Sequence, residues 1–100
     1  MFNFLKKLFG GETVDFKELM ANGAKVIDVR TPQEFAGGHI KGAVNIPLDS
    51  LDRNLKKIQG YNKPLIMCCA SGMRSGRATS FLKSKGMTEV YNGGSWVSLR

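Results

Sequence analysis

The stretch PLIMCCASGMRSGRATSFLKSKG, residues 64–86, decides the fold, because a short loop joins the most hydrophobic run of the chain to a segment of helical character. Residues 64–68 predict a buried central strand, and residues 73–85 predict a helix that ends at Gly86. Open α/β sheets bind their ligands at the carboxyl ends of parallel strands. The loop between this strand and this helix is therefore the candidate site.

Along the rest of the chain, apolar runs of strand length alternate with segments of helical period, which is typical of an α/β domain with a mainly parallel sheet. Further strands are expected at residues 25–29, 43–46 and 89–91, the last followed by a turn at Gly93 and Gly94. Further helices are expected at residues 14–21, with Asp15 and Glu18 at capping-box spacing, and from Pro32, with Thr31 as N-cap and Glu34 reaching back to it. Another helix is expected from Leu48 until Gly60.

Length and composition indicate one globular domain. The chain has 100 residues, of which 42% are hydrophobic and 23% are charged, and its formal net charge is +7. Its basic residues are scattered and do not alternate with aromatic residues, so nucleic acid is not the expected partner. A small anionic substrate fits the positive charge better.

We expect residues 1–11 to be an N-terminal extension or short helix and residues 12–100 to be the domain. The extension lacks the features of a secretory signal, and no run is long enough to span a bilayer. Its apolar residues could cover the domain's own core, which we expect, or contact a membrane surface, which we do not. These residues are Phe2, Leu5, Leu8 and Phe9.

The two cysteines, Cys68 and Cys69, are neighbours and cannot supply a disulfide framework. A reducing compartment, and hence a cytoplasmic location, fits them best. With His39 as the single histidine, the chain also lacks the four ligands of a structural zinc site. We therefore expect neither a metal nor another cofactor.

The loop has the composition of an anion cradle. Ala70, Ser71 and Gly72 are small enough for the backbone to curl with its N–H groups inward, and the following helix adds its unsatisfied amides near Arg74. A thiolate at the base of such a cradle is stabilised, so we expect the pKa of Cys69 to lie well below its free value of about 8.5.

The two cysteines give two registers. Arg74 closes a C-x4-R ring counted from Cys69 and a larger C-x5-R ring counted from Cys68. Cys68 continues the strand pattern and is expected to pack as a small buried hydrophobe, with Cys69 as the first loop residue. The residues alone leave an inert core thiol as an alternative for both cysteines.

Two motifs together carry a family resemblance. The stretch CASGMRS at residues 69–75, and VIDVRTPQEFAGGHIKGAVNIP at residues 26–47, resemble the two signatures of rhodanese-like domains in the correct order and spacing. The resemblance covers roughly residues 12–97. It implies a central, mainly parallel five-stranded sheet with helices on both faces.

The resemblance also implies an activity. The chain is expected to be a single-domain sulfurtransferase in which Cys69 accepts a sulfane sulfur from an anion such as thiosulfate and forms a persulfide. The sulfur then passes to cyanide, to a thiol or to an acceptor protein. Cys68 departs from the family pattern, which often has an aromatic residue or histidine at this position, and its role stays open.

The expected site has three parts. Cys69 is the catalytic residue, and Asp28, Arg30 and His39 give structural support. Arg74 either contacts the incoming anion or holds the shape of the loop. The expected substrate-binding residues are Ala70, Ser71, Gly72, Met73, Arg74 and Ser75.

Two other functions compete with this interpretation. The C-x5-R register is that of phosphatases and arsenate reductases, whose larger loop binds a tetrahedral oxyanion. Alternatively, the domain is a sulfur carrier or a partner-binding module that acts by delivering sulfur to another protein. The sequence does not name the physiological donor, acceptor or pathway.

Overall fold

The computed structural model of the protein describes residues 14–100, so the expected extension at residues 1–11 lies outside the described residues. The strands are β1 (Lys25–Asp28), β2 (Val44–Asn45), β3 (Leu65–Cys69) and β4 (Val90–Ser95). The α-helices are α2 (Phe16–Ala21), α3 (Pro32–Ala36), α4 (Leu55–Gln59), α5 (Met73–Ser84) and α6 (Trp96–Leu99), and two short 3-10 helices are η1 (Leu48–Ser50) and η2 (Asp52–Asn54).

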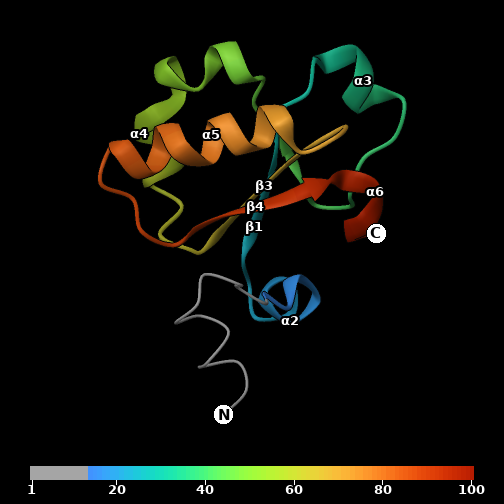
Figure 1. Cartoon of the computed structure of the whole chain (residues 1–100), viewed down its shortest axis with the longest axis horizontal. Coiled ribbons are helices and arrows are strands. Elements are labelled where there is room, and N and C mark those ends of the chain that lie inside the picture. The colour runs from blue at the N-terminus through green and yellow to red at the C-terminus, as the bar shows by residue number, and fades with distance from the viewer. Residues whose placement is uncertain (1–13) are drawn as a thin grey trace.

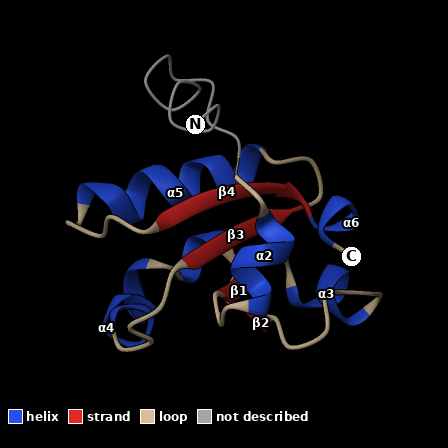
Figure 2. Cartoon of the chain, turned by 90° about the horizontal axis from the view of Figure 1, so that it is seen from below, coloured by secondary structure: helices blue, strands red, loops and turns tan. Residues whose placement is uncertain are grey.

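The strands form one parallel sheet in the order β2-β1-β3-β4, which Figure 2 shows from below. All five residues of β3 are buried, and β3 pairs on both sides, as its hydrophobicity predicts. Five strands were expected, but the sheet within residues 14–100 has four. The other described segments form helices, turns and loops, so they add no strand to it.

Helices cover both faces of the sheet, as predicted. In Figure 1, α4 and α5 lie on one side of the strands and α2 lies on the other. One buried cluster joins β1 and β3 to α4 and α5 through side chains such as Ile27, Met67 and Leu82. A second cluster joins the opposite faces of these strands to α2 and α6. No helix in the described part of the chain is long and apolar enough to cross a bilayer.

The predicted capping signals are present at two helices. The side chain of Thr31 accepts a hydrogen bond from the Glu34 amide, and the Glu34 side chain accepts one from the Thr31 amide, which completes a capping box ahead of Pro32. Asp15 caps α2 by accepting a hydrogen bond from the Glu18 amide. Pro32 begins α3 as expected, whereas α2 begins at Phe16 after its Asp15 cap, two residues later than the expected start at residue 14.

The prediction of a single helix between Leu48 and Gly60 is wrong. The segment forms η1, η2 and only then α4. The Asn54 side chain donates to the Ser50 carbonyl at 2.8 Å, while the Asn54 amide bonds to the Leu51 carbonyl. Because the side chain takes the acceptor that an α-helix would use, the backbone turns more tightly here.

The prediction of a turn at Gly93 and Gly94 is also wrong, because both glycines lie inside β4. Met67 pairs with Asn92 and Cys68 pairs with Gly94, so Gly93 is an extra residue that forms a bulge. A Cβ atom on Gly93 would lie 2.6 Å from Cγ2 of Ile66. The glycine therefore lets β4 approach the part of β3 that leads to Cys69.

We expect Gly93→Ala to lower the free energy of unfolding by about 1–3 kcal/mol, because the new methyl group overpacks against β3. Chemical denaturation measures this change. Gly60→Ala is the matched control, because a Cβ atom there meets only carbonyl oxygens at 3.4 Å. Equal stabilities of the two variants would contradict the close approach of β4 to β3.

Candidate active site

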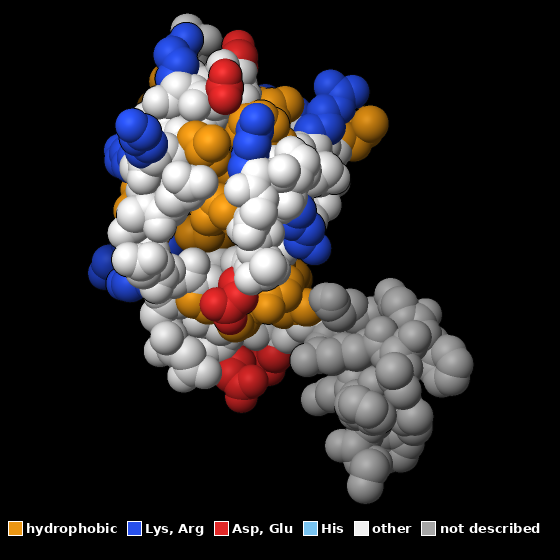
Figure 3. Space-filling view, turned by 90° about the vertical axis from the view of Figure 1, so that its left-hand side faces the viewer, with side chains coloured by type: hydrophobic (Ala, Val, Ile, Leu, Met, Phe, Trp, Pro, Cys, Tyr) orange, Lys and Arg blue, Asp and Glu red, His pale blue; other side chains and the backbone are white. Residues whose placement is uncertain are grey.

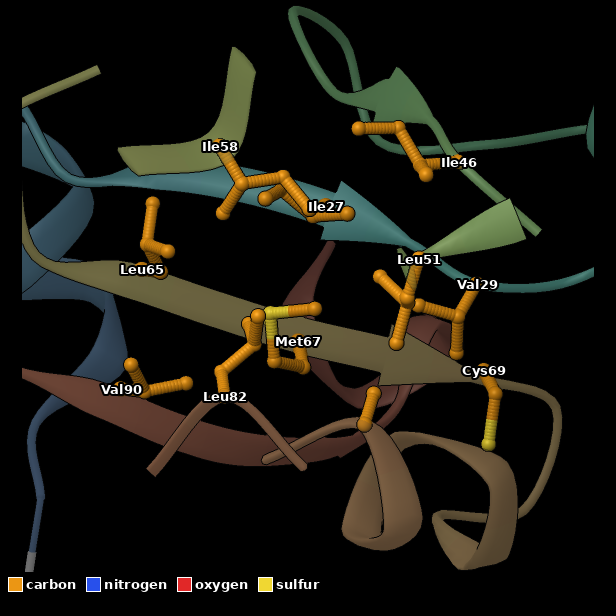
Figure 4. Packing of buried hydrophobic residues seen from close by; sticks show 11 residues of the cluster. Ile27, Val29, Ile46, Leu51, Ile58, Leu65, Met67, Cys69, Leu82 and Val90 are labelled. Atoms are coloured by element: carbon orange, nitrogen blue, oxygen red, sulfur yellow. The ribbon is translucent and has the colours of Figure 1, made fainter. Parts of the chain in front are cut away.

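Cys69 is the last residue of β3 and not, as expected, the first residue of the loop. It continues the sheet because it pairs with Ser95 of β4. Successive side chains of a strand point to opposite faces, so Cys69 lies on the face covered by α5, and Cys68 lies on the other. Figure 4 shows the Cys69 sulfur directed toward the loop and the first turn of α5.

Backbone amides point at the Cys69 sulfur. The Gly72 amide donates to Sγ at 3.0 Å and the Ser75 amide donates to it at 3.4 Å, while the Ser75 hydroxyl oxygen lies 3.5 Å away. Gly72 has φ of +100°, in the left-handed region that favours glycine. The turn at Gly72 therefore directs its amide at the sulfur.

These contacts favour the thiolate. Burial raises the pKa of Cys69, but hydrogen bonds from Ser75, Gly72 and Ser71 outweigh it, and the pKa lies below its ordinary value. The side chain has no exposed surface. A substrate therefore contacts Sγ only after the groups that cover it move.

Cys68 has the opposite environment. Burial, together with the negative charge of Asp28, raises the pKa of its thiol to about 12. The side chain packs against Val26, Ile66 and Leu99. It lies on the far side of the sheet from the loop, so the C-x5-R register, which needs Cys68 as nucleophile, has no geometric support.

Arg74 is held by Glu34 of α3 in a bidentate ion pair, with Nη1–Oε1 and Nη2–Oε2 distances of 2.8 and 3.0 Å. Glu34 also belongs to the capping box with Thr31. The pair ties α3 to the first turn of α5. In this arrangement the guanidinium is paired with a carboxylate of α3.

The hydrogen bonds from Arg74 and then Thr31 lower the pKa of Glu34 to about 2, from an ordinary value of 4.5. The Glu34 carboxylate therefore stabilises the fold fully above pH 4.5, and this contribution is lost as the pH falls toward 2. We expect the parent to be more stable than Glu34→Gln at neutral pH. Denaturation at several pH values should show the difference shrinking in that interval, and a pH-independent difference would refute the assignment.

Asp28 and Arg30 form a buried ion pair with an Nη2–Oδ2 distance of 2.7 Å. Arg30 also donates to the Gly38 carbonyl and stacks on Trp96, with 4.7 Å from its Cζ to the ring centroid. This cluster joins the end of β1 to α6. The cluster lies at the carboxyl end of the sheet, where Cys69 also lies, but it does not contact the sulfur.

His39 lies outside the loop. Its Nδ1 donates to the Phe35 carbonyl at 2.7 Å, and its ring stacks on Phe35 with centroids 3.7 Å apart. Of the loop residues, Ala70, Ser71 and Met73 are exposed, and Met73 is 71% exposed. His39 thus has a structural contact, while these three residues form the outer rim of the site.

Two residues of the site are absent from the sequence prediction. The sequence indicates Glu34 only as a helix cap, although it also binds Arg74. Asn92 of β4 is not among the predicted residues, yet its side chain contacts both Ser75 and Gly72. The sequence offers one signal for Asn92, which is its position directly before two glycines, a pattern typical of tight turns.

Comparison with known proteins supports the resemblance. The sequence model of one family, the Rhodanese-like domain, matches residues 12–97. The chain belongs to this family. A human single-domain sulfurtransferase, TSTD1, is structurally similar to this rhodanese-like domain, with a TM-score of 0.70 and 32% identity over 86% of this chain and 92% of that one.

Two relatives illustrate the similarity in sequence. The thiosulfate sulfurtransferase GlpE of Ectopseudomonas mendocina is 40% identical over 76% of this chain and 69% of its own length. The uncharacterized protein YqhL of Bacillus subtilis is 49% identical over 69% of this chain. The chain spans about half of YqhL, 54% of its length.

The described residues contain no cluster of metal ligands, and one face of the molecule has no basic patch. Figure 3, which views the side away from the carboxyl ends of the strands, shows Lys and Arg side chains spread over the surface and not gathered in one patch. Among residues 14–100, no three His, Cys, Asp or Glu side chains gather in a way that could bind a metal ion. Cys69 and its loop remain the candidate site.

Proposed function

We propose that this rhodanese-like domain is a sulfurtransferase that carries sulfur as a persulfide on Cys69. The observation that supports this most directly is the convergence of the Gly72 and Ser75 amides on one sulfur atom. These groups stabilise negative charge at Sγ. A thiolate is the form of cysteine that attacks another sulfur.

In the first step, the Cys69 thiolate attacks the outer sulfur of thiosulfate. A bond forms between Sγ and this sulfur, the sulfur–sulfur bond of thiosulfate breaks, and its electron pair leaves with sulfite. The product is a persulfide with a negative terminal sulfur. Amides of the loop, together with the start of α5, can stabilise that charge.

In the second step, a nucleophile attacks the terminal sulfur of the persulfide. Cyanide yields thiocyanate, and a thiolate yields a new persulfide on the acceptor; either reaction returns Cys69 to its thiolate. The charge of +7 favours the approach of anions. A cytoplasmic, reducing environment keeps Cys69 available for this cycle.

Thiocyanate formation from thiosulfate and cyanide tests the proposal. We expect turnover by the parent and no hydrolysis of an aryl phosphate, which is the substrate of the competing phosphatase function. Phosphate release without thiocyanate would overturn the proposal. Transfer of sulfur from the persulfide to a protein thiol but not to cyanide would instead identify a sulfur carrier.

A further inference from the structure

Asn92 bridges the two parts of the loop that contact the Cys69 sulfur. Its Nδ2 donates to the Gly72 carbonyl at 3.2 Å, and its Oδ1 accepts from the Ser75 hydroxyl at 2.6 Å. The Gly94 amide donates to the same Oδ1 at 3.0 Å. One carboxamide thus links β4 to Gly72 and Ser75, whose backbone amides donate to Sγ.

The orientation of this carboxamide is fixed by its partners. A flipped amide would place Nδ2 against the Gly94 N–H and Oδ1 against the Gly72 carbonyl, which puts like groups together at both contacts. The bulge at Gly93 places Asn92 here, because it shifts the register of β4 directly after this residue. The Asn92-Gly93-Gly94 segment therefore presents one donor and one acceptor to the loop.

The Ser75 hydroxyl has a single proton, and the 2.6 Å contact directs that proton to Asn92. At the sulfur, the hydroxyl oxygen then acts as an acceptor for the thiol proton. When Cys69 ionises, the backbone amides of Ser71, Gly72 and Ser75 remain as its donors, and Asn92 holds the last two. The stability of the thiolate depends on how firmly these amides are held.

We propose that Asn92 is a positioning residue of the site, which holds the Gly72 and Ser75 amides on the Cys69 sulfur. This inference rests on the proposed role of Cys69. Asn92 itself does not touch the sulfur or the substrate. It forms hydrogen bonds with the Gly72 carbonyl and the Ser75 hydroxyl. Its loss therefore loosens the two residues whose backbone amides donate to Sγ.

The test compares Asn92→Ala with the parent by two measurements. The first is the pH titration of the Cys69 thiolate, followed by its ultraviolet absorbance and corrected with Cys69→Ala. Arg74 and Cys68 couple electrostatically to Cys69, and the substitution leaves both in place. We expect the midpoint to rise by about one pH unit, because the thiolate loses ordered donors.

The second measurement is the rate of sulfur gain from thiosulfate at a pH about one unit below the parent's midpoint, where the thiolate fraction is small in both proteins. A rise of one unit lowers the thiolate fraction about tenfold, while the more basic thiolate is roughly threefold more nucleophilic. We therefore expect loading about threefold slower than in the parent. A midpoint that stays parental, or that falls because the freed Ser75 hydroxyl now donates to the thiolate, would overturn the proposal.

Asn54→Ala is the matched control, because Asn54 also donates to a backbone carbonyl, at 2.8 Å, but lies in η2 away from the loop. It should lose stability without moving the Cys69 midpoint. An equal shift in this control would assign the effect to general loosening and would also overturn the proposal.

Gly76→Ala tests the same contact without altering Asn92. A Cβ atom on Gly76 would lie 3.3 Å from Asn92 Nδ2, so the methyl group must push the carboxamide aside by a few tenths of an ångström, while alanine favours the helix. We expect the midpoint to rise here too, and this variant decides the matter if Asn92→Ala does not fold. The titration needs no sulfur transfer, so a parent that gains no sulfur refutes the proposed function and leaves the positioning test valid.

Discussion

Replacing Cys69 with alanine is expected to lower thiocyanate formation by about three orders of magnitude or more, because the persulfide has no other sulfur on which to form. Cys68→Ala is expected to retain most of the activity. The two cysteines are adjacent and both are fully buried, so the two substitutions remove the same atoms from similar packing. Their environments differ in the amides around Cys69 and the raised pKa of Cys68.

Steady-state rates with thiosulfate and cyanide measure this difference. Denaturation of both variants shows whether either loss reflects instability, since each leaves a small cavity in the core. Equal loss in the two variants would contradict the assignment of the nucleophile to residue 69. Loss in Cys68→Ala alone would support the C-x5-R register in place of C-x4-R.

Asp28→Ala is expected to destabilise the protein by about 3–5 kcal/mol, because it leaves the Arg30 guanidinium buried without its counter-charge. The Asp28 side chain is fully buried, and the side chain of Arg30 is 5% exposed. Asp28 also accepts from the Arg30 amide at 3.0 Å. Such a loss is a large part of the total stability of a domain of this size.

Denaturant unfolding checks this value, and two variants serve as comparison. Asp28→Asn keeps an acceptor for Arg30 and should lose less stability than the alanine variant. Glu34→Gln breaks the exposed pair with Arg74 and should have a much smaller effect at neutral pH. A loss in Asp28→Ala no greater than that in Glu34→Gln would argue against a structural role for the buried pair.

Local patterns predict most of the fold. The run from Leu65 to Cys69 is buried and pairs on both sides, and the capping box of Thr31 and Glu34 forms before Pro32 as expected. These features depend on neighbours in the sequence, so a single sequence is enough to detect them. The alternation of side chains along a strand likewise predicts that Cys68 and Cys69 face opposite sides of the sheet.

Contacts between distant segments are not predictable in the same way. Glu34 and Arg74 are 40 positions apart, and Asn92 is 17 positions from Ser75. No local pattern links such partners, because the sheet order alone brings them together. The sequence predicts a turn at Gly93 because glycine pairs are typical of turns, whereas close packing against Ile66 is the reason for glycine here.

The most direct test of the central claim is the intact mass of the protein after incubation with thiosulfate. We predict the gain of one sulfur atom, located on Cys69 by fragmentation, removed by cyanide and absent from Cys69→Ala. A parent that gains no sulfur, or that gains it on Cys68, would contradict the account.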